Sequence, residues 1–104
     1  MEEKKVAIVT GASRGIGRAT AVELARAGFY VVVNYNASEA AAAETLAQVE
    51  AAGSAGEIRK FDVADAAAVK EALAAVVAEH KRIDVLVNNA GVTADGLFMM
   101  MGVE

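Results

Sequence analysis

Runs of apolar residues alternate along the chain with segments in which apolar residues recur at helical spacing. Four apolar runs predict strands, at Lys5 to Thr10, Tyr30 to Asn34, Glu57 to Phe61 and Ile83 to Val87. Within these runs the apolar residues follow one another directly, as they do in strands that are buried on both faces of a parallel sheet. The pattern therefore predicts a layered α/β fold in which strands and helices alternate.

Three segments between these strands carry helix signals. The first predicted helix covers Ile16 to Ala27 and stops at Gly28, a residue typical of helix C-terminal ends. The second begins near Ser38, a good N-cap, and stops at Gly53, and the third takes Asp65 as its N-cap. The inward face of the third helix is predicted to carry four apolar residues, Val69, Leu73, Val76 and Val77. Ser38 and Asp65 thus set the expected starts of the last two helices.

Length and composition limit what the chain can be. Its 104 residues allow one small domain, and the net charge of −4 argues against a general nucleic-acid binder. The absence of cysteine and a single histidine, His80, exclude thiolate and multi-histidine metal sites. No run reaches the ~18 apolar residues of a membrane span, and the charged N-terminus lacks a signal-peptide core. A cytoplasmic protein without a metal, a membrane partner or a nucleic-acid partner is expected.

The run Thr10-Gly11-Ala12-Ser13-Arg14-Gly15-Ile16-Gly17 joins the first strand to the first helix. Unpaired N–H groups of a first helical turn and the helix dipole favour an anion at such a junction. The glycines do not follow the G-x-G-x-x-G spacing, and no Gly-Lys-Ser/Thr follows, which excludes a Walker A loop. An ordinary glycine-rich turn is the structural alternative. Three glycines at this junction favour a nucleotide-binding loop.

Three motifs together resemble the short-chain dehydrogenase/reductase family: the glycine run, Asp62-Val63 after the third strand, and Asn88-Asn89-Ala90-Gly91 after the fourth. The resemblance implies a three-layer Rossmann-like half-domain over residues 1–104, with parallel strands in the order 3-2-1-4 and helices on both faces. The tail from Gly91 is most similar to those of 3-oxoacyl-(acyl-carrier-protein) reductases, while acetoacetyl-CoA reductases have similar tails. An NADPH-dependent reductase of a 3-oxoacyl thioester is therefore the implied parent activity.

Cofactor preference is predicted from charge at the end of the second strand. An acidic residue there usually binds the ribose of NAD, but this chain has Asn34, Asn36 and Ser38 and no acid before Glu39. Arg14 in the glycine loop supplies a guanidinium suited to a 2′-phosphate. We therefore expect NADP(H). A solvated loop charge is the structural alternative for Arg14.

The resemblance implies further cofactor contacts around the sheet. Asp62 would bond the adenine amino group, and Val63 would lie near the ring, although Asp62 alone is more typical of a turn. Asn88 is expected to tie neighbouring strands together. The full set of expected cofactor-binding residues is Gly11, Ser13, Arg14, Gly15, Ile16, Gly17, Asn34, Asn36, Ser38, Asp62, Val63, Asn89, Ala90 and Gly91.

No catalytic residue is assigned. In the family a tyrosine followed four residues later by a lysine donates the proton, but Tyr30 and Tyr35 are followed at that spacing by Asn34 and Glu39. The chain is therefore expected to be an N-terminal half without turnover. A non-catalytic nucleotide-binding fragment or a folding scaffold is the alternative to an enzyme.

Three expectations concern packing and partners. The fourth strand would be a sheet edge, and one sheet face would be covered by the third helix alone, so self-association through either is predicted. The run from Phe98 to Met101 is expected to form the first turn of an interface helix. His80 is expected only to stabilise the end of the third helix through the helix dipole.

Overall fold

The computed structural model describes residues 4–89 and 98–100. The chain forms strands and helices in the order β1 (Val6–Val9), α1 (Gly15–Arg26), β2 (Tyr30–Tyr35), α2 (Glu39–Ala51), β3 (Gly56–Lys60), α3 (Ala66–His80), β4 (Val85–Val87) and β5 (Phe98–Met100). The predicted alternation of strands and helices is confirmed, with boundaries that shift by one or two residues at most ends.

The sheet has the order β3-β2-β1-β4-β5. The first four strands are parallel, and Val9 in β1 lies opposite Val33 in β2 on one side and Val87 in β4 on the other. The predicted parallel order 3-2-1-4 is therefore confirmed. Because the strands are parallel, their carboxyl ends lie along one edge of the sheet.

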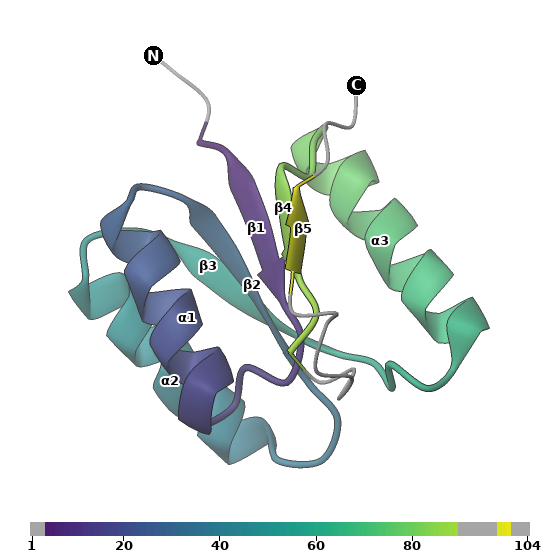
Figure 1. Cartoon of the computed structure of the whole chain (residues 1–104), viewed down its shortest axis with the longest axis horizontal. Helices are drawn as coiled ribbons and strands as arrows, with labels where there is room; N and C mark the ends of the chain where they lie inside the picture. The colour runs from purple at the N-terminus through teal and green to yellow at the C-terminus, as the bar shows by residue number, and fades with distance from the viewer. Residues whose placement is uncertain (1–3, 90–97, 101–104) are drawn as a thin grey trace.

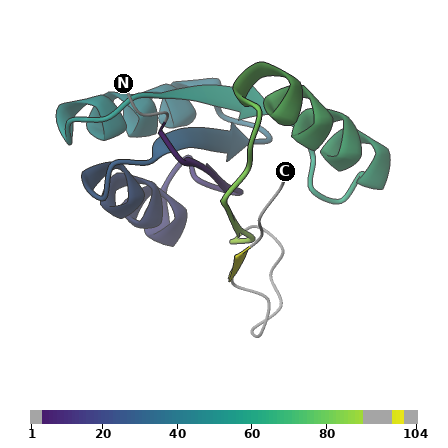
Figure 2. The ribbon, with the colours of Figure 1, turned by 90° about the horizontal axis from the view of Figure 1, so that it is seen from above.

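The fourth strand is not the sheet edge that the sequence predicts. Phe98–Met100 pairs antiparallel with Val85–Val87 as β5, and in the view from above β5 lies beyond β4 (Figure 2). The expectation of a helical turn from Phe98 is therefore wrong for residues 98–100, and Met101 lies outside the described residues. The physical reason is that an edge strand presents unpaired N–H and C=O groups, and a following apolar segment satisfies them by pairing.

The helices lie on both faces of the sheet. Helices α1 and α2 lie together on one side of the strands and α3 on the other (Figure 1). One buried cluster joins α1 and α2 to the sheet through residues such as Ala21, Val33 and Val49. A second cluster joins Val76 of α3 to Ile8 and other strand residues. This three-layer arrangement is the one that the resemblance implies.

Helices α2 and α3 both begin at the predicted caps. The Ser38 hydroxyl accepts a hydrogen bond from Ala41 N at 3.2 Å, and Asp65 Oδ1 accepts from Ala67 N and Ala68 N at 3.1 and 3.2 Å. Each cap satisfies N–H groups that lack a partner within the helix. In the described part of the chain, none of the helices combines the length and the apolar character that crossing a bilayer requires.

The C-terminal end of α3 is fixed by a polar cluster at the amino edge of the sheet. Glu57 Oε1 accepts a hydrogen bond from the Tyr30 hydroxyl at 2.8 Å and lies 3.1 Å from His80 Nε2, while Arg59 donates to Glu57 and to Glu79. The rings of Tyr30 and His80 also pack, with centroids 4.4 Å apart. The dipole account of His80 is therefore incomplete, because the side chain also ties α3 to β2 and β3.

The same cluster contains a possible cation-binding set. Glu57, Glu79 and His80 offer ligand atoms within 4.8 Å of one another. Arg59 donates hydrogen bonds to both carboxylates, so its guanidinium supplies the positive charge that neutralises them.

The pKa of Glu57 makes this cluster sensitive to acid. Burial raises the pKa of the carboxyl, but hydrogen bonds from Arg59, His80 and Tyr30 lower it by more, so it lies below its ordinary value of 4.5. A carboxyl whose pKa is depressed by folding stabilises the fold above its unfolded pKa and loses that contribution as the pH falls through its folded pKa.

We therefore expect the free energy of unfolding to fall between about pH 5 and pH 3, and Glu57→Gln to flatten that slope. Urea unfolding at a series of pH values measures this, with Glu50→Gln on the exposed surface of α2 as the control. A slope in Glu57→Gln equal to that of the wild type contradicts the assignment.

Candidate functional site

The predicted site residues gather at the carboxyl edge of the parallel strands. The glycine loop follows β1, and its Ala12 N donates a hydrogen bond of 3.0 Å to the carbonyl oxygen of Asn34 at the end of β2. On the other side, Thr10 N donates to Val87 O at 2.9 Å, which joins the loop to the end of β4. The ends of three strands are thus bonded into one surface, where open α/β sheets bind ligands.

The glycine loop uses its glycines for two physical tasks. Gly11 and Gly15 have φ angles of 62° and 64°, in the left-handed region that other residues rarely adopt. A Cβ on Gly17 would overlap the carbonyl oxygen of Gly11 and lie 2.9 Å from both Ala12 Cα and Asn89 Nδ2. Gly17 therefore allows α1 to start directly against the loop and the end of the sheet.

The N-terminus of α1 differs from those of the other helices, because no side chain among the described residues caps it. Arg14 is the N-cap residue, with extended backbone, and its side chain makes no capping hydrogen bond. The first turn also contains no acidic residue. Its unpaired N–H groups and the positive end of the helix dipole therefore remain available to an anion. Ile16, on the same turn, is 78% exposed and offers an apolar contact beside them.

Asn34 has a place that the sequence does not predict. Its side chain is buried, with 2% exposed, and its Oδ1 accepts a hydrogen bond from Gly11 N at 3.0 Å. Its Nδ2 donates to the carbonyl oxygen of Phe61 at 3.0 Å. These bonds hold the loops after β1 and β3 together, so the side chain is directed into the protein and is bonded to backbone groups. An asparagine at the end of an apolar strand gives no sequence signal that separates this role from a ligand contact.

The asparagines after β4 join the same network. Asn88 Oδ1 accepts a hydrogen bond from the Thr10 hydroxyl at 3.3 Å, which confirms its predicted role in tying strands together. Asn89 Nδ2 donates to Gly11 O at 3.1 Å and so lies against the glycine loop. The predicted contacts at Ala90 and Gly91 lie outside the described residues.

The remaining predicted residues surround this surface. Arg14 and Asn36 are exposed, while Ser13 and Ser38 are partly exposed, and Ser38 is engaged as the cap of α2. Asp62 is exposed, and its Oδ1 accepts from Ala64 N at 2.9 Å in a local turn. One carboxylate oxygen of Asp62 forms this turn, while the other is not part of it.

A small cavity lies between the carboxyl edge and α3. Its volume is about 120 Å³, and it is lined by Thr10, Phe61, Val63, Val69, Leu73, Leu86 and Asn88. Val63 thus lies at the wall of an apolar hollow next to the strand ends, which is compatible with a position near a flat ring.

Sequence reasoning missed two residues that bind the loop. Arg18 donates from its guanidinium to Ser13 O at 2.7 Å, and the buried Thr45 hydroxyl lies 2.8 Å from Ala12 O. A signal was present, because Thr45 is a β-branched hydroxyl residue at a buried position of an alanine-rich helix. Arg18 gives a weaker signal, since arginine is common on exposed helix surfaces.

A parallel sheet with a glycine loop, an uncapped helix N-terminus and loop ends at its carboxyl edge defines a Rossmann-type nucleotide-binding fold. The sequence profile of the short chain dehydrogenase family matches residues 5–103. The chain therefore belongs to the short-chain dehydrogenase family.

Curated relatives and solved structures agree with this assignment. The chain is 46% identical over 101 residues to the 3-oxoacyl-(acyl-carrier-protein) reductase FabG of Staphylococcus aureus strain Mu50, which covers 97% of this chain and 41% of the relative. Among structures, a putative dehydrogenase from Burkholderia cenocepacia with bound NADP has a TM-score of 0.75 and 34% identity, covering 83% of this chain and 34% of the other. An NADH-dependent reductase, A1-R′, complexed with NAD has a TM-score of 0.75 and 36% identity, covering 83% and 36%. The chain thus spans less than half the length of these relatives.

The tight approach at Gly17 leads to a first test of the site. Gly17→Ala should destabilise the chain by about 2 kcal/mol or more, because the new methyl group meets backbone atoms that are held by hydrogen bonds. Ala19→Ser, at an exposed position of the same helix, should change stability by no more than about 0.5 kcal/mol. Thermal and urea unfolding measure both changes. Equal stability of Gly17→Ala and the wild type contradicts the close approach.

Proposed function

We propose that this chain is the dinucleotide-binding part of a ketoreductase, with NADP(H) as its cofactor. The observation that carries the proposal is the uncapped N-terminus of α1 beneath a glycine loop that approaches it closely. In this position the N–H groups of the first turn would bind the pyrophosphate. Family membership and relatives that are named for bound NAD or NADP support a nicotinamide dinucleotide.

The preference for NADP(H) rests on the charges around the end of β2. Arg14 is exposed at the start of α1, and the first residue after β2 is the exposed and neutral Asn36. A guanidinium with no carboxylate before Glu39 favours a 2′-phosphate over a bare hydroxyl. Since the Asn34 side chain is buried, Asn36 and Ser38 are the neutral groups that remain for the phosphate.

The proposed substrate class comes from the relatives. The similarity to a 3-oxoacyl-(acyl-carrier-protein) reductase supports reduction of a 3-oxoacyl thioester to the 3-hydroxyacyl thioester by the whole protein. In this assignment Asp62 and Val63 would bind the adenine, and Asn89, Ala90 and Gly91 would line the cofactor at its ribose. An acetoacetyl-CoA reductase is the closely related alternative, and the whole protein is expected in the cytoplasm.

A second candidate is a nucleotide-binding module without turnover. Neither tyrosine offers a proton donor at the carboxyl edge: Tyr30 is bonded to Glu57 at the opposite edge, and Tyr35 is only 8% exposed. Burial and the hydrogen bond to Glu57 also raise the pKa of Tyr30, which makes it a poorer acid. This observation favours binding without reduction for the chain as it stands.

The test of cofactor choice is a fluorescence titration of the chain with NADPH and with NADH. Arg14→Ala should weaken NADPH binding about tenfold or more and NADH binding much less, because only NADPH carries the 2′-phosphate. Arg26→Ala, an exposed arginine at the far end of α1, is the matched control. If Arg14→Ala weakens the binding of NADPH and NADH equally, the proposed role of Arg14 is contradicted.

The same preparations separate the two candidates. NADPH oxidation with an acetoacetyl thioester is measured beside the titration, and saturable binding without turnover is the expected result. Turnover would contradict the binding-module candidate. Absence of binding to either nucleotide would contradict both.

We also propose that the chain self-associates. Because β5 covers the edge of β4, the contact is assigned to the second predicted surface, the sheet face beside α3. Leu73, Val77 and Leu86 are only partly buried there. Sedimentation velocity at about 100 μM, well above weak-contact concentrations, should show a species larger than the monomer. A strictly monomeric chain at that concentration contradicts the contact.

A further inference from the structure

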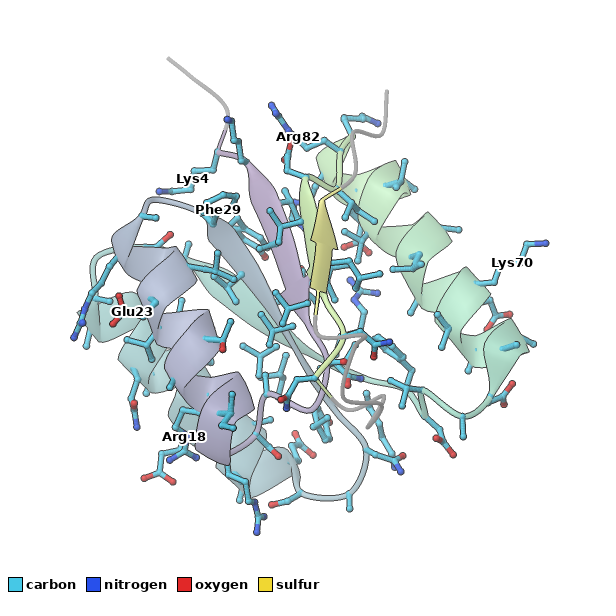
Figure 3. All side chains as sticks on the ribbon, in the orientation of Figure 1. Lys4, Arg18, Glu23, Phe29, Lys70 and Arg82 are labelled. Atoms are coloured by element: carbon cyan, nitrogen blue, oxygen red, sulfur yellow. The ribbon has the colours of Figure 1, made fainter. Side chains whose placement is uncertain are left out.

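Two side chains join the glycine loop to α2 through consecutive backbone carbonyls. Arg18 lies toward the N-terminal end of α1, close to α2 (Figure 3). Its guanidinium donates to Ser13 O at 2.7 Å and to Ala41 O at 3.1 Å, and its Nε donates to the Thr45 hydroxyl oxygen at 2.8 Å. We call Arg18 and Thr45 with these bonds the loop clamp.

The directions of the hydrogen bonds in the loop clamp follow from the donors. Since the Thr45 oxygen accepts from Arg18, its single hydroxyl proton is free to be donated, and Ala12 O is the nearest acceptor at 2.8 Å. Ser13 O lies 3.2 Å from the same hydroxyl and already accepts from Arg18. Thr45 is completely buried, and the Arg18 side chain is 23% exposed. Both carbonyls are therefore held toward α2 by groups that are largely shielded from water.

Fixing these two carbonyls also fixes two amides. In a trans peptide unit the N–H points opposite to the C=O, and the described residues contain no cis peptide bond. With the carbonyls of Ala12 and Ser13 directed toward α2, the N–H groups of Ser13 and Arg14 are directed away from it. None of the backbone hydrogen bonds of the described residues outside helices and strands uses either of these two N–H groups. They extend the row of unpaired donors at the start of α1 by two.

We propose that Arg18 and Thr45 are positioning residues for the diphosphate of the cofactor. They touch no phosphate themselves, but they orient the Ser13 and Arg14 amides, which do. This inference rests on the proposed dinucleotide site and adds residues that neither the glycine spacing nor the charge argument identifies. The clamp also explains why α2 carries a threonine among alanines at the position that faces the loop.

Charge alone does not account for the role of Arg18. Its guanidinium also lies 3.5 Å from the exposed Glu44 carboxylate, which offsets part of its positive charge. Lysine keeps the charge but lacks the planar fork that reaches Ser13 O, Ala41 O and Thr45 together. Arg18→Lys therefore tests whether the hydrogen-bond geometry of the guanidinium, as opposed to its charge, is required. Thr45→Val removes only the hydroxyl, and Thr45→Ser restores it.

The experiment measures dissociation constants for ADP, which carries the diphosphate, and for adenosine, which lacks it. Arg18→Lys and Thr45→Val should each raise the dissociation constant for ADP about tenfold. The dissociation constant for adenosine should change by no more than about twofold. Thr45→Ser should retain wild-type ADP binding, and Arg26→Lys on the same helix is the matched control. Melting temperatures of all variants are recorded, so that binding is compared only where each variant is folded.

Two results would overturn the proposal. Unchanged ADP binding in folded Arg18→Lys and Thr45→Val would show that the clamp serves stability alone. Equal weakening of ADP and adenosine would show a general loss of the site instead of misdirected amides.

A second readout does not depend on any ligand. Backbone ¹⁵N order parameters of Ser13 and Arg14 should be about 0.85 in the wild type and fall below about 0.6 in Thr45→Val. If the wild type binds no nucleotide, the proposed function fails, and these order parameters then decide whether the clamp itself orders the loop. Unchanged order parameters in Thr45→Val would overturn the clamp.

Discussion

The buried amide of Asn34 holds the site end of the fold together. It accepts from Gly11 N and donates to Phe61 O, so one side chain at the end of β2 fixes the loops that follow β1 and β3. A buried polar group left without partners costs about 1–3 kcal/mol, which disfavours any arrangement in which these loops separate. Gly11, which Asn34 fixes through its N–H, also accepts a hydrogen bond from Asn89 and lies directly against Gly17 at the start of α1.

The sequence predicts those features of the structure that depend on neighbouring residues in the chain. Continuous apolar runs predict the parallel strands, and Ser38 and Asp65 predict two helix starts, because these signals act within a few residues. The burial of Asn34 depends on partners that lie 23 and 27 residues away in sequence. The pairing of β5 depends on a neighbour that the local run of Phe98 does not reveal. Such long-range pairings leave no local pattern, so the sequence predicts neither the burial of the Asn34 side chain nor the strand at Phe98.

The polar side chains at the two ends of the strands differ in what they bond to. At the amino edge, Tyr30, Glu57, Arg59 and His80 satisfy one another and fix the end of α3. At the carboxyl edge, the described polar groups satisfy the backbone of the loop and leave the donors of the α1 turn unused. Strong ion pairing next to a phosphate site would compete with the ligand for the same charges. Most ion pairs of the described residues lie away from the loop, and the exception is the 3.5 Å contact of Arg18 with the exposed Glu44. The field at the loop therefore remains available to an anion.

The missing cap of α1 makes the ligand a structural element of the helix. Ser38 and Asp65 supply α2 and α3 with the acceptors that their first turns need, and such a cap stabilises a helix by about 1 kcal/mol. Helix α1 has no such acceptor from the described side chains, so the ligand-free fold lacks the stabilisation that a cap would provide. An anion that binds there completes the helix as a cap does, and by thermodynamic linkage its binding energy is also folding energy. Occupancy of the loop would therefore add to the free energy of unfolding of the helix that binds the anion.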